Sequence, residues 1–257
     1  MRDIRHLANE IGPRHGTSNA YREAAGWVEQ RFVELGYKID RQHVGVPAGT
    51  TWGVRVPRGR ADNIIASPPG FDDEKPHRIV GAHLDTVPRS PGAEDNGSGI
   101  AVLLELARIH ADAPGNVRFI AFAAEEPRGV GNDHHYGSRT YVRRLDSLER
   151  NAVRGMISLD RVGVGRAVPL STGGLGTRKL RDRLEAIATD RGVRIELHGD
   201  DRASDHWSFE HAGLTAARVG SVPYCCYHAP TDRPPIISKK QVRRVGAIVT
   251  AWLRDDN

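Results

Sequence analysis

Short apolar runs alternate with amphipathic segments along the chain, and each kind predicts a different element. Mostly apolar runs at 79–82, 117–124, 155–159 and 215–219 predict buried strands, and shorter patterns at 62–66 and 193–197 predict two more. Apolar residues recur at helical spacing in 24–35, 100–110, 180–187 and 242–253, and Ser238 is a candidate N-cap for the last of these helices. This alternation is typical of an α/β fold.

Neither a repeat, a low-complexity tract nor a shift in composition divides the chain, so we expect residues 1–257 to form one domain. The net charge is +5 and most of the 37 basic residues are Arg, spread along the chain. Because no nucleic-acid-binding motif accompanies them, we expect no nucleic-acid partner.

The first residues, 1–6, are polar, and no apolar stretch approaches the length of a membrane span. The sequence therefore predicts a cytoplasmic protein with no membrane contact, or a secreted one if a leader was removed.

Potential metal ligands stand at the ends of the predicted strands or in the loops beyond them. A single His or acidic residue there is usually a cap or a solvated side chain. Several together indicate a shared site, because open α/β sheets bind ligands at the carboxyl ends of their strands. The candidates are His83, Asp85, Asp95, Glu125, Glu126, Asp160 and His228.

The segments around these residues resemble peptidase family M28, a family of zinc aminopeptidases. The matching motifs are, in order, GAHLD, GAEDNGSGIAVLLELAR, FAAEE, SLD, SDHWSF and YHAPTD, and the resemblance begins with LANEIGPR at 7–14. It implies a single-domain, three-layer αβα fold with a mixed, mostly parallel central sheet. It also implies two Zn²⁺ ions per chain and hydrolysis of peptides that have a free N-terminus.

The resemblance further implies a role for each residue. One metal would be held by His83, Asp95 and Asp160, and the other by Asp95, Glu126 and His228. Asp85 would orient His83, and Glu125 would be the general base. Tyr227 would either donate a hydrogen bond to the developing oxyanion, as a tyrosine beside the last ligand does in some relatives, or only pack.

Elementary chemistry supports these roles. Two divalent ions about 3.5–4 Å apart need a shared anionic ligand, and a short carboxylate such as Asp95 can bridge them. Imidazole and carboxylate ligands together suit Zn²⁺, with Co²⁺ or Mn²⁺ as substitutes. Consecutive residues of an extended segment point to opposite sides, so Glu125 and Glu126 need different tasks. One can reach a metal while the other accepts the proton of the attacking water.

Alternatives remain beside the aminopeptidase. A glutaminyl-cyclase-like acyltransferase shares the fold and uses one metal, although EDNGSG at 94–99 favours a peptidase. A non-catalytic binding module would be expected to have lost ligands. The M20 carboxypeptidases share the HxDxVP pattern of 83–88 but carry an inserted lid domain, for which this chain has no room. Nucleophilic mechanisms have little support, since there is no GxSxG motif and Cys225 and Cys226 are expected to be free thiols.

The segment 127–136, PRGVGNDHHY, is expected to be an exposed, turn-rich loop that starts at the rim of the site and helps to select the substrate side chain. Tyr136 or the two histidines would make that contact. A paired His in a polar loop is otherwise expected to be solvated, which is the competing reading of His134 and His135. Ser204-Asp205-His206 is expected to support the site rather than to form a triad, and Arg202 is a weaker candidate for the oxyanion role.

Overall fold

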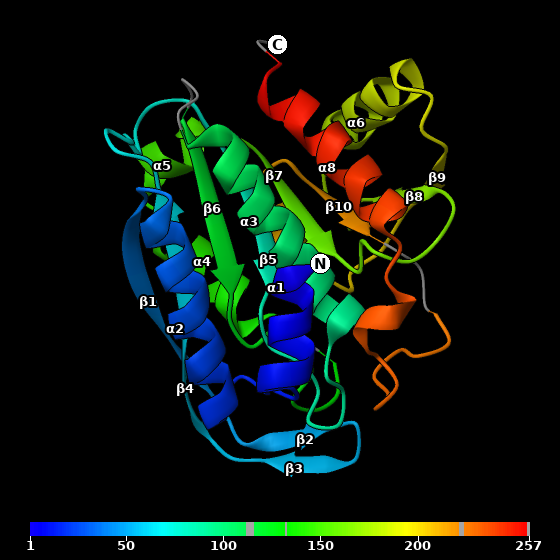
Figure 1. Ribbon diagram of the computed structural model, residues 1–257. Coiled ribbons are helices and arrows are strands. Elements are labelled where there is room, and N and C mark those ends of the chain that lie inside the picture. Colours follow the sequence, from blue (N-terminus) through cyan, green and yellow to red (C-terminus); the bar gives the residue numbers. More distant parts are fainter. Residues whose placement is uncertain (112–115, 132, 221–223, 256–257) are drawn as a thin grey trace.

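A computed structural model describes residues 1–111, 116–131, 133–220 and 224–255. Its centre is an eight-stranded sheet in the order β1-β4-β6-β5-β7-β10-β8-β9 (Figure 1). The strands are β1 (Lys38–Val46), β4 (Gly59–Ser67), β5 (His77–His83), β6 (Val117–Phe122), β7 (Val153–Asp160), β8 (Val168–Ser171), β9 (Ile195–His198) and β10 (Ala216–Gly220). A hairpin of β2 (Gly49–Thr51) and β3 (Val54–Val56) forms a separate, two-stranded sheet.

The middle of the large sheet is parallel. β5 pairs in parallel with β6 on one side and with β7 on the other, and β7 pairs in parallel with β10. β4 and β8 run antiparallel to their neighbours β6 and β10, and β1 runs antiparallel to β4. The carboxyl ends of β6, β5, β7 and β10 therefore meet at one edge of the sheet.

Helices cover both faces of the sheet, so the molecule has three layers (Figure 1). The first layer, in front in Figure 1, contains α2 (Asn19–Glu34), α3 (Gly99–His110), α6 (Lys179–Asp190) and α8 (Lys239–Leu253). The opposite layer contains α4 (Tyr136–Arg144), α5 (Ser147–Ala152) and α7 (His206–His211). Shorter helical segments are α1 (Arg2–Arg5), His6–Ile11, Ala93–Ser98 and Pro234–Ile236. The predicted three-layer αβα fold with a mostly parallel sheet is confirmed.

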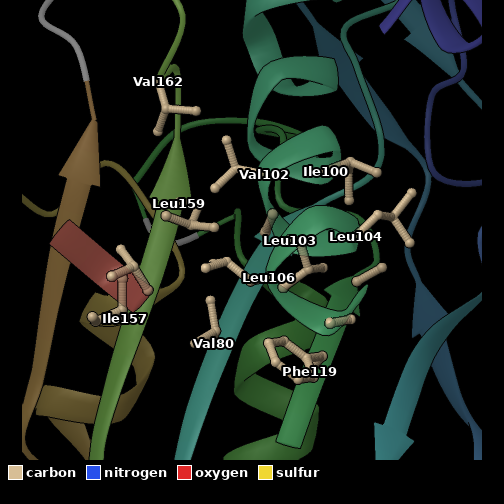
Figure 2. Packing of buried hydrophobic residues seen from close by; sticks show 14 of the residues in the cluster. Val80, Ile100, Val102, Leu103, Leu104, Leu106, Phe119, Ile157, Leu159 and Val162 are labelled. Carbon is tan, nitrogen blue, oxygen red and sulfur yellow. The ribbon is translucent and has the colours of Figure 1, made fainter. Parts of the chain in front are cut away.

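Successive residues of a central strand point to opposite faces of the sheet and belong to two different apolar clusters. Val80 belongs to the cluster that faces α3, whereas its neighbour Ile79 belongs to the cluster that includes Tyr141 of α4 and Phe209 of α7. Figure 2 shows the first cluster, in which strand side chains lie against those of α3. Burial on both faces explains why the central strands read as continuous apolar runs.

Every strand predicted from the pattern overlaps a strand of the structure, and the predicted helices correspond to α2, α3, α6 and α8. The Oγ of Ser238 accepts a hydrogen bond from the amide of Gln241 at 3.3 Å, so Ser238 caps α8 as expected. The pattern gave no indication of β1, whose first half is largely exposed because it forms an edge of the sheet. No helix in the described part of the chain has the length and apolar composition to cross a membrane.

Candidate metal centre

The sheet edge formed by the central parallel strands brings the predicted ligands to one cavity. His83 and Asp160 are the last residues of β5 and β7, and Glu125 and Glu126 follow β6. Asp95 lies in the turn Ala93–Ser98 directly before α3, and the loop after β10 supplies His228. The cavity has a volume of about 330 Å³. The topology alone therefore gathers residues that are up to 145 positions apart in the chain.

Asp95 stands between two imidazoles. Its Oδ1 lies 3.1 Å from Nε2 of His83, and its Oδ2 lies 3.1 Å from Nε2 of His228. The turn is fixed by Asp232, which accepts hydrogen bonds from the backbone amides of Glu94 at 2.8 Å and Asp95 at 3.1 Å. One carboxylate oxygen thus faces each half of the site, which is the arrangement that a shared ligand requires.

Two groups of potential ligands flank this carboxylate. Asp95, Glu126 and His228 form one group, and His83, Glu125 and Asp160 form the other, with one ligand atom per residue and all such atoms within 4.8 Å of one another in each group. In the second group, Nε2 of His83 is 3.5 Å from Asp160 and 3.9 Å from Glu125. All the residues proposed from the sequence as ligands therefore converge, and Glu125 lies with them.

The donor set fits divalent cations. Oε1 of Glu126 and Oδ1 of Asp160 are buried and make no hydrogen bond within the described chain. A buried carboxylate oxygen without a donor costs free energy unless a cation faces it. Carboxylate oxygens and imidazole nitrogens are the ligands that zinc takes in catalytic sites.

The pKa values of the acidic groups in the cavity are shifted strongly, and in different directions. Burial raises the pKa of Glu125 to about 8, with His83 opposing the rise, and burial raises the pKa of Glu126 to about 8, with His228 opposing it. Burial also favours the neutral form of Asp95, but His228 and His83 hold its pKa well below the usual value. Groups whose pKa values are pushed apart in one cavity are typical of a functional site.

Asp85 is placed to fix the end of β6. Its Oδ1 accepts a hydrogen bond from the amide of Glu125 at 2.9 Å, and its Oδ2 accepts one from the amide of Glu126 at 3.2 Å. The carboxylate lies 3.7 Å from Nδ1 of His83, beyond hydrogen-bond distance, and Nδ1 instead lies 3.1 Å from the Asp85 carbonyl oxygen. Asp85 therefore orients His83 through its backbone and both glutamates through its side chain.

The loop 127–135 is exposed at its tip, as expected, but buried at His135. Its tip is exposed, with Val130 at 90%, and Asn132 lies outside the described residues. His135, however, is buried, so the reading of it as a solvated histidine is wrong. Its amide donates to the Glu125 carbonyl at 2.9 Å, and its Nε2 lies 2.9 Å from Oε1 of Glu125. The sequence around His135 is polar and gives no sign of burial. The contact arises because the end of the loop lies against Glu125, just after β6.

Tyr227 and Arg161 complete the wall of the cavity. The Tyr227 ring stacks on His228 with the ring centroids 3.8 Å apart, and the Arg161 guanidinium lies 4.8 Å from the Tyr227 ring centroid. Burial raises the pKa of the Tyr227 hydroxyl above its usual value, so this group stays a hydrogen-bond donor at neutral pH. Arg202 also lines the cavity, at an exposed position. Arg161 was not anticipated, because an Arg beside an acidic residue usually lies at the surface.

A buried arginine near the N-terminus holds the loop between β5 and Asp95. The guanidinium of Arg14 donates hydrogen bonds to the carbonyls of Leu84 at 2.8 Å and Pro91 at 2.8 Å, among others. Arg14 is fully buried, and burial lowers its pKa to about 10. The segment LANEIGPR is far from the candidate ligands in sequence, but its Arg14 holds the loop that leads from His83 to Asp95.

Ser204, Asp205 and His206 are not arranged as a triad. Oγ of Ser204 lies 2.9 Å from Oγ of Ser158, and Nε2 of His206 lies 2.8 Å from the carbonyl of Asp201. The segment instead ties the start of α7 to β7. Both Cys225 and Cys226 are free thiols, as expected.

Comparison with known proteins agrees with this geometry. Residues 63–253 match the model of peptidase family M28. The aminopeptidase YwaD of Bacillus subtilis is 35% identical over 188 residues, which cover 67% of this chain and 39% of that protein. The chain thus spans well under half the length of this relative.

Solved structures share the fold over nearly the whole chain. A zinc aminopeptidase from Bacillus subtilis superposes with a TM-score of 0.85 at 20% identity, covering 97% of this chain and 92% of that one. The glutaminyl cyclase of Fimbriiglobus ruber superposes with a TM-score of 0.81 at 25% identity, covering 98% of this chain and 93% of that one.

Proposed function

The chain belongs to peptidase family M28, and from this premise we propose that it is a dinuclear zinc aminopeptidase. It would hydrolyse the first peptide bond of substrates with a free N-terminus. The observation that carries the proposal is the position of Asp95. Its Oδ1 lies 3.1 Å from the His83 imidazole, and its Oδ2 lies 3.1 Å from the His228 imidazole. A single-metal site would use this carboxylate on one side only.

His83, Asp95 and Asp160 would hold one ion, and Asp95, Glu126 and His228 the other. When bound, two such ions polarise the scissile carbonyl and make a water molecule acidic enough to be deprotonated near pH 7. Co²⁺ and Mn²⁺ accept the same ligands and would be substitutes.

Glu125 would be the general base. Its Oε1 is 2.9 Å from His135, whereas its Oε2 is on the side of His83, 3.9 Å from Nε2. One oxygen is therefore held by the loop while the other remains available to accept a proton and pass it to the leaving amine. The Tyr227 hydroxyl would donate a hydrogen bond to the oxyanion that develops on the carbonyl oxygen.

A second candidate function follows from the likeness to the glutaminyl cyclase of Fimbriiglobus ruber. A cyclase would release ammonia from an N-terminal glutamine and leave a ring, without consuming water. It would need only one metal, which a single one of the two ligand groups could hold.

One assay separates these functions. Zinc-loaded protein is incubated with a leucyl peptide, its N-acetylated form and a glutaminyl peptide, and products are identified by mass. We expect release of the first residue from the free peptide and at least about 100-fold slower reaction of the acetylated one. Cyclised product from the glutaminyl peptide without hydrolysis of the leucyl peptide would establish the cyclase instead, and equal hydrolysis of both leucyl peptides would refute the aminopeptidase.

A further inference from the structure

A buried cation, Arg161, lies in the wall of the cavity, and its one ion pair among the described residues is a long contact with Asp160. Arg161 is 5% exposed and follows Asp160 at the end of β7. Its Nε is 3.6 Å from Oδ1 of Asp160 and makes no hydrogen bond within the residues that the structure describes. The guanidinium instead lies over the ring of Tyr227.

Asp160 already has a closer cation on its other oxygen. The Arg218 guanidinium is 3.1 Å from Oδ2 of Asp160 and 2.7 Å from Asp201, and Arg218 is itself buried. Arg218 is therefore the closer of the two guanidinium groups beside Asp160, and this carboxylate does not require a second cation.

If two divalent ions were bound, the carboxylates that line the cavity would not need the charge of Arg161. The acidic side chains that line it are Asp95, Glu125, Glu126 and Asp160. Under the proposed function, the two divalent ions balance these four carboxylates. A buried charge that remains unpaired costs several kcal/mol, and an anionic group on a ligand would relieve this cost.

The position of Arg161 beside the candidate metal ligand Asp160 limits where that anionic group can be. The cavity volume of about 330 Å³ is at the lower end of the range of roughly 300–1,000 Å³ for ligand pockets. A peptide reaching Arg161 from the metal site must carry its charge within one or two residues of the cleaved bond. The free carboxylate of a dipeptide and the side chain of Asp or Glu are the groups with that reach.

We propose that Arg161 binds a carboxylate of the substrate, so that the preferred substrates are dipeptides or peptides with an acidic residue beside the cleaved bond. This inference rests on the proposed peptidase function and adds the substrate class to it. The planar guanidinium can donate two parallel hydrogen bonds to a carboxylate, and its contact with Tyr227 keeps it beside the group that would stabilise the oxyanion.

Matched substrates test the proposal on the zinc-loaded protein. Leu-Leu is compared with Leu-Leu amide, and Glu-Leu amide with Gln-Leu amide, by measuring kcat/KM. We expect the charged member of at least one pair to be favoured by about 10–100-fold, since hydrogen bonds to charged groups are the strong ones. The pair that shows the preference identifies the source of the carboxylate. Equal rates within both pairs would overturn the proposal.

Arg161→Met should abolish the preference, so that the charged and the neutral member of each pair have the same kcat/KM within about threefold. Arg166→Met is the matched control, because Arg166 is exposed, lies in the same connection between β7 and β8, and does not line the cavity. It should keep the preference. If Arg161→Met slows all four substrates equally, Arg161 serves the scaffold or the oxyanion and the proposal is wrong. If the variant does not fold, the wild-type pairs decide.

A binding measurement separates failure of this proposal from failure of the proposed function. Calorimetry on zinc-loaded Glu125→Gln protein should show that Leu-Leu or Glu-Leu amide binds at least about 10-fold more tightly than its neutral partner, and that adding Arg161→Met removes the difference. If the wild-type protein hydrolyses no peptide but this difference is found, the peptidase function fails and the carboxylate site stands. If the protein hydrolyses the peptides but neither rate nor binding depends on the substrate charge, the peptidase function stands and the carboxylate site fails.

Discussion

Glu125 and Glu126 are adjacent in sequence but have different partners. Glu125 contacts His135, whereas Glu126 belongs to the ligand group of Asp95 and His228. We expect Glu125→Gln to retain both metal ions and to lower kcat by about 10²–10⁴-fold, because it keeps the shape and removes the base. Glu126→Gln should lose metal as its first defect. Metal content measured beside kcat tests this, and the reverse pattern would exchange the two roles.

His135 is expected to act as a positioning residue for Glu125, because its Nε2 lies 2.9 Å from Oε1. His135→Gln should lower kcat by about 10-fold, roughly the value of one hydrogen bond to a charged group, with KM and metal content little changed. His134→Gln is the control, since His134 lines the cavity but, among the described residues, makes no hydrogen bond or ion pair with Glu125. Equal losses of kcat in both variants would show that His135 supports the structure of the loop and does not position Glu125.

At this scale the sequence predicts the site in part. The candidate ligands could be found because each one stands at the end of an apolar run or in the loop beyond it, and parallel strands bring such ends together. His135 and Arg161 could not be found in this way. The neighbours of His135 in sequence are polar, and Arg161 follows an acidic residue. The contacts of these two side chains are with Glu125 and with Tyr227, which are distant in sequence.

Two loops far apart in sequence form the rim of the site. The amide of Thr50 in β2 donates to the carbonyl of Arg128 at 3.0 Å, and a Cβ on Gly49 would come within 1.8 Å of that same oxygen. The turn after β2 carries Trp52, whose ring centroid is 4.4 Å from that of His228. The hairpin and the 127–135 loop are therefore positioned as one unit beside the metal ligands.

Gly49→Ala should push this unit apart. We expect a rise in KM and a changed order of rates across a panel of aminoacyl substrates, with both metals still bound. Gly45→Ala is the matched control, because a Cβ on Gly45 of β1 meets nothing within 4 Å. A panel profile that is identical in Gly49→Ala and wild-type protein would show that the rim does not select substrates.

The elements that were predicted correctly are those with a strong local pattern of apolar residues. The central strands are buried on both faces and α3 carries an apolar stripe, so tertiary packing agrees with local pattern. The hairpin of β2 and β3 has only three residues in each strand, and its position depends on Gly49 meeting Arg128. No local pattern encodes such a contact.

Metal binding should contribute to the stability of the whole molecule. The ligands come from three strands and from the segments around Asp95 and His228, so bound ions would cross-link distant parts of the chain. At free metal of about 100 times the Kd, each occupied site stabilises the native state by about 2.7 kcal/mol. For a domain of this size, that corresponds to a rise in Tm of about 5–10 °C. Calorimetric scans before and after chelation test this, and an unchanged Tm would mean that the acidic cluster binds no metal.

The central claim is that Asp95 is shared by two catalytic ions. The most direct test is a zinc titration of metal-free protein in which bound zinc per chain and hydrolysis of a free leucyl peptide are measured on the same samples. We expect activity to reach its maximum at two ions per chain, and Asp95→Ala to bind neither ion tightly. Full activity at one ion per chain, or two tightly bound ions in Asp95→Ala, would contradict the account.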